Sequence, residues 1–186
     1  MPELPQDLSR LSLDQIAELA AARRLPPVDQ WAPTKFGHSE MRIARDGTWY
    51  HQGGPIRRET MVRLFSSILR RDPDGRHFLV TPVEKLEIEV EDAPFIAIEV
   101  KSEGAGKDRS LAFRLNTGDL IIAGPEHRLR FNEVNGEPHP LLGVRGGMDA
   151  LVSRAAFYAL ADWAIAEENA PLGLWSEGVF FPMAAA

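Results

Sequence analysis

Arginines and aromatic residues close to glycine-containing turns are the residues of this sequence best suited to ligand-binding chemistry. Arg57 and Arg58 directly precede a predicted helix, and Arg145 precedes a second one across Gly146-Gly147. Backbone N–H groups at a helix N-terminus attract anions, and a guanidinium adds a two-pronged contact with phosphate or carboxylate. Aromatic rings beside arginines suit a base or sugar ring next to a phosphate. The predicted ligand-binding set is Arg57, Arg58, Lys85, Arg145, Trp49, Tyr50 and Trp175.

A carboxylate in the last predicted helix is the second candidate for a special role. On a helical wheel, Asp162 falls inside the apolar stripe of that helix. The other members of the stripe are Val152, Ala155, Tyr158 and Ala166. A buried carboxylate needs a cationic partner, for which Arg145 and Arg58 are the first candidates. We therefore predict that Asp162 is a structural buried charge.

No group of residues matches a known catalytic or metal-binding motif. The sequence has no cysteine, and its five histidines lack the spacing of metal ligands. The segment 104–108, GAGKD, lacks the first glycine and the final Ser/Thr of a phosphate-binding loop and lies between predicted strands. The alternating acids Glu87, Glu89 and Glu91 indicate a solvated strand face rather than a cation site. We predict no catalytic residue, no metal and no cofactor.

Composition excludes several classes of protein. The net charge of −6 argues against binding of duplex nucleic acid, which requires a basic face. No apolar run approaches the roughly 20 residues that cross a membrane, and the N-terminus shows no secretory signal. These features predict a cytoplasmic protein that binds neither duplex nucleic acid nor a membrane.

The first 75 residues are predicted to form an N-terminal helix followed by a hairpin-helix unit. A helix over residues 9–24 has Ser12 as a candidate N-cap and Pro26-Pro27 as its stop. After an irregular stretch, Asp46-Gly47 predicts a hairpin turn. A helix is then predicted from residue 58 to residue 71, with one face packed on a core. That face consists of Met61, Val62, Leu64, Phe65, Ile68 and Leu69.

Residues 77–145 are predicted to form about seven short antiparallel strands separated by turn signals. A helix over 148–168 follows, and the apolar tail from Pro171 is expected to dock on the body. This predicts an α+β protein with domains at 1–75 and 76–186. The second domain has the element order of a pleckstrin-homology-like barrel with a capping helix.

An ungapped internal match suggests a duplicated strand-turn-helix unit. The segment that starts at Arg58 matches the one that starts at Arg145 in the spacing of Arg, Met, apolar and Ser positions. The alternative is that two amphipathic helices share an apolar pattern without common ancestry.

Several segments between residues 31 and 182 carry a resemblance to a known family. They are Ile43–Tyr50, Gly54–Arg58, Leu64–Ser66, Leu79–Lys85, Glu91–Phe95, Val144-Arg145 and Trp175–Gly178. They resemble the bacterial "domain of unknown function 1285" family. The resemblance implies a two-part α+β protein with a duplicated core, a C-terminal half loosely like pleckstrin-homology domains, and a suspected ligand site between the halves. It implies no established activity and no catalytic residue.

The favoured function is therefore ligand binding or regulation, with an anionic, nucleotide-like molecule held between the two halves in signal transduction. The alternative is a protein–protein interaction or scaffold module without a small-molecule ligand. Such a module would dock a partner through the arginine-rich helix or the tail at 175–181, and the sequence does not identify that partner. An enzyme ranks third, because no nucleophile–base pair is visible.

Overall fold

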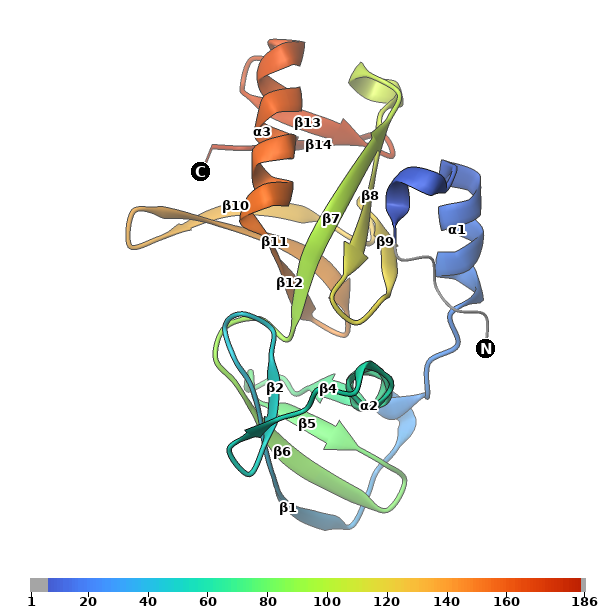
Figure 1. The fold of residues 1–186 in the computed structure, drawn as a ribbon, viewed down its shortest axis with the longest axis vertical. Helices are drawn as coiled ribbons and strands as arrows, with labels where there is room; N and C mark the ends of the chain where they lie inside the picture. Colours follow the sequence, from blue (N-terminus) through green and yellow to red (C-terminus); the bar gives the residue numbers. More distant parts are fainter. Residues whose placement is uncertain (1–6, 185–186) are drawn as a thin grey trace. The chain divides into compact units, whose positions relative to one another are not determined.

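The computed structural model describes residues 7–184, which divide into two compact units (Figure 1). Unit 1 comprises the chain up to Arg23, Phe95–Arg145 and the chain from Asp149 onward. Unit 2 comprises Arg24–Pro94 and Gly146–Met148. The predicted division between residues 75 and 76 differs from this one, because the strands that follow residue 75 pair within unit 2.

Unit 2 is built on a six-stranded sheet and one α-helix. Its strands are β1 (Lys35–Ile43), β2 (Trp49–His51), β3 (Gly54–Pro55), β4 (Leu69–Arg71), β5 (His77–Val80) and β6 (Glu84–Val90), with α2 (Glu59–Ser67) between β3 and β4. The strand order is β3-β2-β1-β6-β5-β4. The hairpin at Asp46-Gly47 is confirmed, and Gly47 takes the positive φ of 86° that the turn requires.

The helix α2 is shorter than predicted and less buried. It ends at Ser67, and residues 69–71 pair with β5 instead of continuing the helix. The sheet satisfies the backbone hydrogen-bonding groups of residues 69–71, which a helix would also have done. The helical periodicity of the side chains therefore could not exclude a strand here. Leu64, which was assigned to the packed face, is 62% exposed, and Met61 is exposed as well.

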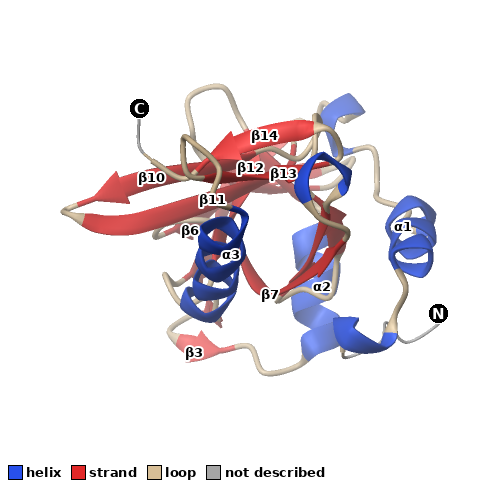
Figure 2. Ribbon diagram, turned by 90° about the horizontal axis from the view of Figure 1, so that it is seen from above, coloured by secondary structure: helices blue, strands red, loops and turns tan. Residues whose placement is uncertain are grey.

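Unit 1 holds a second six-stranded sheet, two α-helices and a small hairpin. The sheet strands are β7 (Phe95–Glu103), β8 (Ser110–Leu115), β9 (Leu120–Ile122), β10 (Leu129–Val134), β11 (Glu137–Arg145) and β12 (Met148–Val152). Figures 1 and 2 show α3 (Arg154–Glu167) alongside this sheet, while α1 (Leu13–Ala22) packs Ile16 against Ala112 and Leu120. The capping box of α1 confirms Ser12 as its N-cap.

The apolar tail docks on unit 1, as expected. It forms the hairpin of β13 (Gly173–Ser176) and β14 (Val179–Pro182), with Leu174 and Phe181 fully buried. The seven strands predicted between residues 77 and 145 are all present as β5 to β11. They belong to two sheets rather than one, and each sheet also contains one parallel pair, β1 with β6 and β7 with β12. The predicted likeness to pleckstrin-homology domains stays a prediction.

The two sheets have the same topology, so the predicted duplication is confirmed at the level of the fold. The order β9-β8-β7-β12-β11-β10 in unit 1 repeats β3-β2-β1-β6-β5-β4 in unit 2, strand for strand. Each sheet consists of two three-stranded antiparallel meanders joined by one parallel pair. That pair is β1 with β6 in unit 2 and β7 with β12 in unit 1. The ungapped sequence match is wrong in detail, because it aligns helix α2 with strand β12.

The last helix begins later than predicted, which changes the environment of Asp162. Residues 148–152 are strand β12, and α3 starts after Ser153, whose hydroxyl accepts a hydrogen bond from the Ala156 N–H. The buried positions of α3 are Ala156, Leu160 and Ala164, at intervals of four residues. Asp162 lies two residues from Leu160, on the opposite side of the helix, and is exposed. The prediction that Asp162 is buried is therefore wrong.

The helices of residues 7–184 include none that is long and apolar enough to cross a membrane.

Candidate functional site

A buried carboxylate between β8 and β9 is the centre of a charged cluster in unit 1. Asp119 is only 5% exposed and follows the turn in which Gly118 has a φ of 86°. Its carbonyl oxygen accepts the Leu115 N–H at 2.8 Å, which closes the turn. The Thr117 hydroxyl donates a hydrogen bond of 2.8 Å to Asp119 Oδ2. The turn therefore holds the carboxylate in a fixed orientation.

Arg23 brings the first positive charge to this carboxylate. It is the C-cap residue of α1, and its backbone N–H is bonded to the Ala20 carbonyl. Its Nε lies 2.7 Å from Asp119 Oδ1, but the N–H does not point at the oxygen, so the contact is an ion pair without a hydrogen bond. Arg23 Nε and Nη2 are both buried, and no hydrogen-bond acceptor for them lies within residues 7–184.

Arg145, at the end of β11, brings the second positive charge. Its Nη1 lies 4.0 Å from Asp119 Oδ2, and its guanidinium lies over the Phe95 ring at 5.0 Å. Burial lowers the pKa of Arg145, and the charge of Arg23 lowers it further, while Asp119 acts in the opposite direction. An arginine nevertheless stays protonated. Arg23 and Arg145 thus bring two guanidinium groups to the carboxylate of Asp119.

This arrangement suits an oxyanion better than it suits a metal or a catalytic step. A buried guanidinium N–H without an acceptor is costly, and an anionic oxygen would supply the missing partner. Within residues 7–184, no three His, Asp or Glu side chains lie close enough together to hold a metal ion. Sequence reasoning identified Arg145 but missed Arg23, Thr117 and Asp119, because nothing in the sequence indicates that the end of α1 meets the β8–β9 turn.

Five residues of the predicted ligand-binding set lie in unit 2. Arg57 and Arg58 are exposed, and Arg58 is the N-cap of α2 without a capping side-chain hydrogen bond. Lys85 on β6 is already engaged, since its ammonium contacts Asp72 and lies 4.1 Å above the Phe78 ring. Lys85 therefore forms a structural ion pair with Asp72.

The two predicted aromatic residues of unit 2 face opposite sides of their sheet. Trp49 is 1% exposed and stacks on Phe65 of α2 with ring centroids 6.5 Å apart. Tyr50, the next residue on β2, lies under the Arg42 guanidinium at 4.3 Å. Adjacent strand residues point to opposite faces, so Trp49 and Tyr50 do not line one surface together.

Trp175 and Arg145 are the predicted residues that lie in unit 1. Trp175 on β13 packs against Phe180 at 5.3 Å and lies beneath the Lys107 ammonium at 5.5 Å. Its neighbour Ser176 is fully buried, and the Ser176 hydroxyl donates to the Ala123 carbonyl and accepts the Leu111 N–H. This part of the tail motif therefore fastens the hairpin to the sheet.

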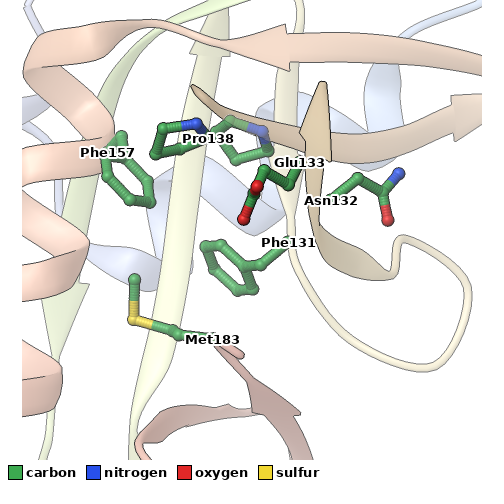
Figure 3. A pocket seen from close by; sticks show the side chains of 7 residues that line it. Phe131, Asn132, Glu133, Pro138, Phe157 and Met183 are labelled. Atoms are coloured by element: carbon green, nitrogen blue, oxygen red, sulfur yellow. The ribbon is translucent and has the colours of Figure 1, made fainter. Parts of the chain in front are cut away.

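A small apolar pocket lies beside α3 in unit 1, with a cavity volume of about 90 Å³ (Figure 3). It lies between the β10–β11 hairpin, α3 and the residue that follows β14. Its lining residues are Phe131, Asn132, Glu133, Pro138, Pro140, Phe157 and Met183. The Phe131 and Phe157 rings are 6.3 Å apart, and in Figure 3 the Asn132 side chain points away from them.

Comparison with known proteins agrees with this two-part architecture. Residues 26–93 match the N-terminal domain of DUF1285, a domain of unknown function, and residues 94–183 match the C-terminal domain of that protein family. No curated protein matches the chain.

Two crystal structures are similar to the chain. A DUF1285 family protein from Silicibacter pomeroyi DSS-3 is 46% identical, with a TM-score of 0.78 over 92% of this chain and 95% of that one. A DUF1285 family protein from Shewanella baltica OS155 is 26% identical, with a TM-score of 0.52 over 70% of this chain and 93% of that one. The chain therefore belongs to the DUF1285 family, as its sequence motifs indicated.

Proposed function

We propose that this protein is a cytoplasmic ligand-binding or regulatory protein whose cluster of Arg23, Arg145 and Asp119 binds a small phosphate-bearing anion. The observation that carries the proposal is the buried Nη2 of Arg23, a charged donor that has no acceptor. A phosphate oxygen would accept that N–H in a charge-assisted hydrogen bond. Asp119 would then act as the group that orients Arg23 rather than as a ligand of the anion.

A nucleotide-like ligand in signal transduction is the more specific form of this proposal. Arginine binds phosphate with two parallel N–H groups, and an aromatic ring beside a guanidinium accommodates a planar base. Phe95 lies directly under Arg145 and is fully buried, so it supports the guanidinium, and a base would stack on the plane of the guanidinium itself. Inorganic phosphate, pyrophosphate and AMP therefore form a graded series of probes, from the anion alone to the anion with a base.

Thermal unfolding in the presence of these three probes tests the proposal. A ligand that binds only the folded state stabilises it by RT ln(1 + [L]/Kd), or about 2.7 kcal/mol at a hundredfold excess over Kd. We expect a rise in Tm for at least one probe, a loss of that rise in Arg23→Gln, and a smaller rise in Arg23→Lys. Lysine keeps the charge but lacks the planar pair of donors.

Arg130→Gln is the matched control, because it also removes an arginine of unit 1 that is paired with an aspartate. Arg130 Nη2 lies 2.6 Å from Asp149, but the Arg130 side chain is 49% exposed. This variant should keep the full response to the probe. A Tm that no probe raises, or a rise that survives Arg23→Gln, would refute anion binding at this cluster.

A protein-interaction role is the second candidate, and an exposed apolar pair in unit 2 favours it. Phe36 is 74% exposed and Val83 is 63% exposed, and the adjacent Lys35 N–H donates to the Val83 carbonyl at 3.3 Å. Large apolar side chains that gather on a surface mark contact sites. A photo-crosslinking amino acid at position 36 should capture one discrete partner in cells, and the same probe at exposed Glu18 should not.

A further inference from the structure

The apolar pocket beside α3 opens next to an outer strand of the unit 1 sheet. Strand β10 is an edge strand of this sheet, whose order is β10-β11-β12-β7-β8-β9. Two of its residues, Phe131 and Glu133, line the pocket with their side chains (Figure 3). The cavity of about 90 Å³ has the size of a single apolar side chain rather than that of a cofactor.

The hydrogen-bond pattern of the hairpin shows which backbone groups of β10 face outward. The turn Asn135-Gly136 has positive φ at both residues, 54° and 79°, as in a type I′ turn. The flanking residues Val134 and Glu137 of such a turn form a hydrogen-bonded pair, and every second pair then repeats the pattern. At the end of the hairpin far from the turn, the Gly143 N–H donates to the Arg128 carbonyl at 2.9 Å. This hydrogen-bonded pair falls where the alternation that starts at Val134 and Glu137 predicts one.

Phe131 and Glu133 therefore occupy the non-hydrogen-bonded positions opposite Pro140 and Pro138. Their backbone N–H and C=O groups point away from β11, towards the outer edge of the sheet. Among the described residues, none makes a hydrogen bond with these groups. The Glu133 carboxylate is exposed and has no ion pair within residues 7–184.

We propose that the outer edge of β10 and the adjoining pocket bind an extended peptide segment of a partner protein. The peptide pairs with the backbone of Phe131 and Glu133 as an added strand. One apolar side chain of the peptide fills the pocket between Phe131, Phe157 and Met183. A lysine or arginine two residues away lies on the same face of the added strand and meets Glu133.

A second copy of this chain is a poor occupant, because its own β10 cannot supply these side chains. On the pocket-facing side of β10, Leu129 and Phe131 are buried in their own unit, and Phe131 is only 8% exposed. The strand's basic residue, Arg130, lies on the opposite face and is paired with Asp149. The acidic, apolar surface thus fits an apolar and basic peptide better than it fits itself.

Selection of random twelve-residue peptides displayed on phage, with the full chain as bait, tests the proposal. We expect enrichment of an apolar residue two positions from a lysine or arginine. A fluorescein-labelled copy of the most enriched peptide should bind the wild-type chain in a polarisation assay. Glu133→Lys should weaken this binding at least tenfold, and a peptide with glutamate in place of its basic residue should restore it.

Glu133→Pro tests the strand pairing separately from the charge. It removes an N–H that points outward, so the ladder between β10 and β11 keeps its hydrogen bonds. Binding should again fall at least tenfold, with an unchanged circular dichroism spectrum. Glu137→Ala is the control, because this exposed residue of β11 does not line the pocket, and it should bind as the wild type does.

Three results would overturn the proposal. They are a selection that enriches no such motif, a selected peptide whose affinity survives both Glu133 variants, and a chain that is dimeric by light scattering and becomes monomeric in Glu133→Pro. The last result would assign the β10 edge to a second copy. None of these results depends on anion binding by Arg23, so the two proposals fail independently.

Discussion

Replacement of Ser176 by alanine should destabilise unit 1 strongly, although it removes only one oxygen atom. Ser176 lies at the end of β13 and is fully buried. Its hydroxyl donates to the Ala123 carbonyl at 2.7 Å and accepts the Leu111 N–H at 2.9 Å. A single side chain thus satisfies two backbone groups of the sheet and ties the C-terminal hairpin to it.

The expected cost follows from those two backbone groups. A buried donor or acceptor that loses its partner costs about 1–3 kcal/mol. Ser176→Ala leaves one of each, and the methyl group cannot admit water into the gap. We therefore expect the free energy of unfolding to fall by about 2–4 kcal/mol, a large share of the stability of an ordinary domain.

Urea unfolding followed by circular dichroism measures this loss, and Ser67→Ala provides the matched control. The Ser67 hydroxyl donates only to the Leu64 carbonyl of its own helix, at 2.6 Å. That variant should stay within about 0.5 kcal/mol of the wild type. If Ser176→Ala were equally mild, the hydroxyl would not be what fastens the hairpin, and our reading of the tail motif would be refuted.

Three further predictions concern charged groups. Arg109→Met leaves the carboxylate of Glu167, whose side chain is only 13% exposed, without its guanidinium partner, and should lower the free energy of unfolding by about 3–5 kcal/mol in a urea titration. Burial raises the pKa of Asp72, but hydrogen bonds from Lys85 and Arg70 outweigh it, so the net pKa is lowered. The folded state therefore gains stability above the unfolded-state pKa of about 3.9 and loses it as the pH falls further, and Asp72→Asn should remove that acid dependence. Burial and the charge of Arg71 lower the pKa of His77, so the unfolded state binds its proton more readily, and stability should decline as the pH falls below about 6.5. His77→Gln should abolish that decline, and an unchanged slope in thermal melts between pH 7 and pH 5 would contradict the assignment.

Turns and caps were the features most readily predicted from the sequence. Asp46-Gly47 and Asn135-Gly136 form hairpin turns, and Ser12 caps α1, as expected. Each depends on residues within a few positions of one another, because a turn or cap is closed by local hydrogen bonds. The strands β5 to β11 were also identified, since alternation of side chains along a strand is a local property.

Predictions failed where pairing with another strand decided between helix and strand for the same residues. Residues 148–152 are apolar enough for a helix, but they pair with β7 as a parallel strand. Residues 69–71 leave the helical pattern for a nearby partner, since they pair antiparallel with β5. Parallel pairing joins segments far apart in the chain, so it cannot be predicted from the periodicity of either segment.

The sequence by itself determined the family, the turns and the number of strands between residues 77 and 145. Only the tertiary structure decided which strands share a sheet and which charges meet. Arg23 reaches Asp119 because α1 packs Ile16 on Ala112 and Leu120, beside the turn that carries the carboxylate. Asp162, which helical phase alone had placed in the core, faces outward because the face of α3 that packs on unit 1 is the one with Ala156, Leu160 and Ala164. Burial and charge pairing depend on contacts between segments distant in sequence, and those contacts exist only once the chain has folded.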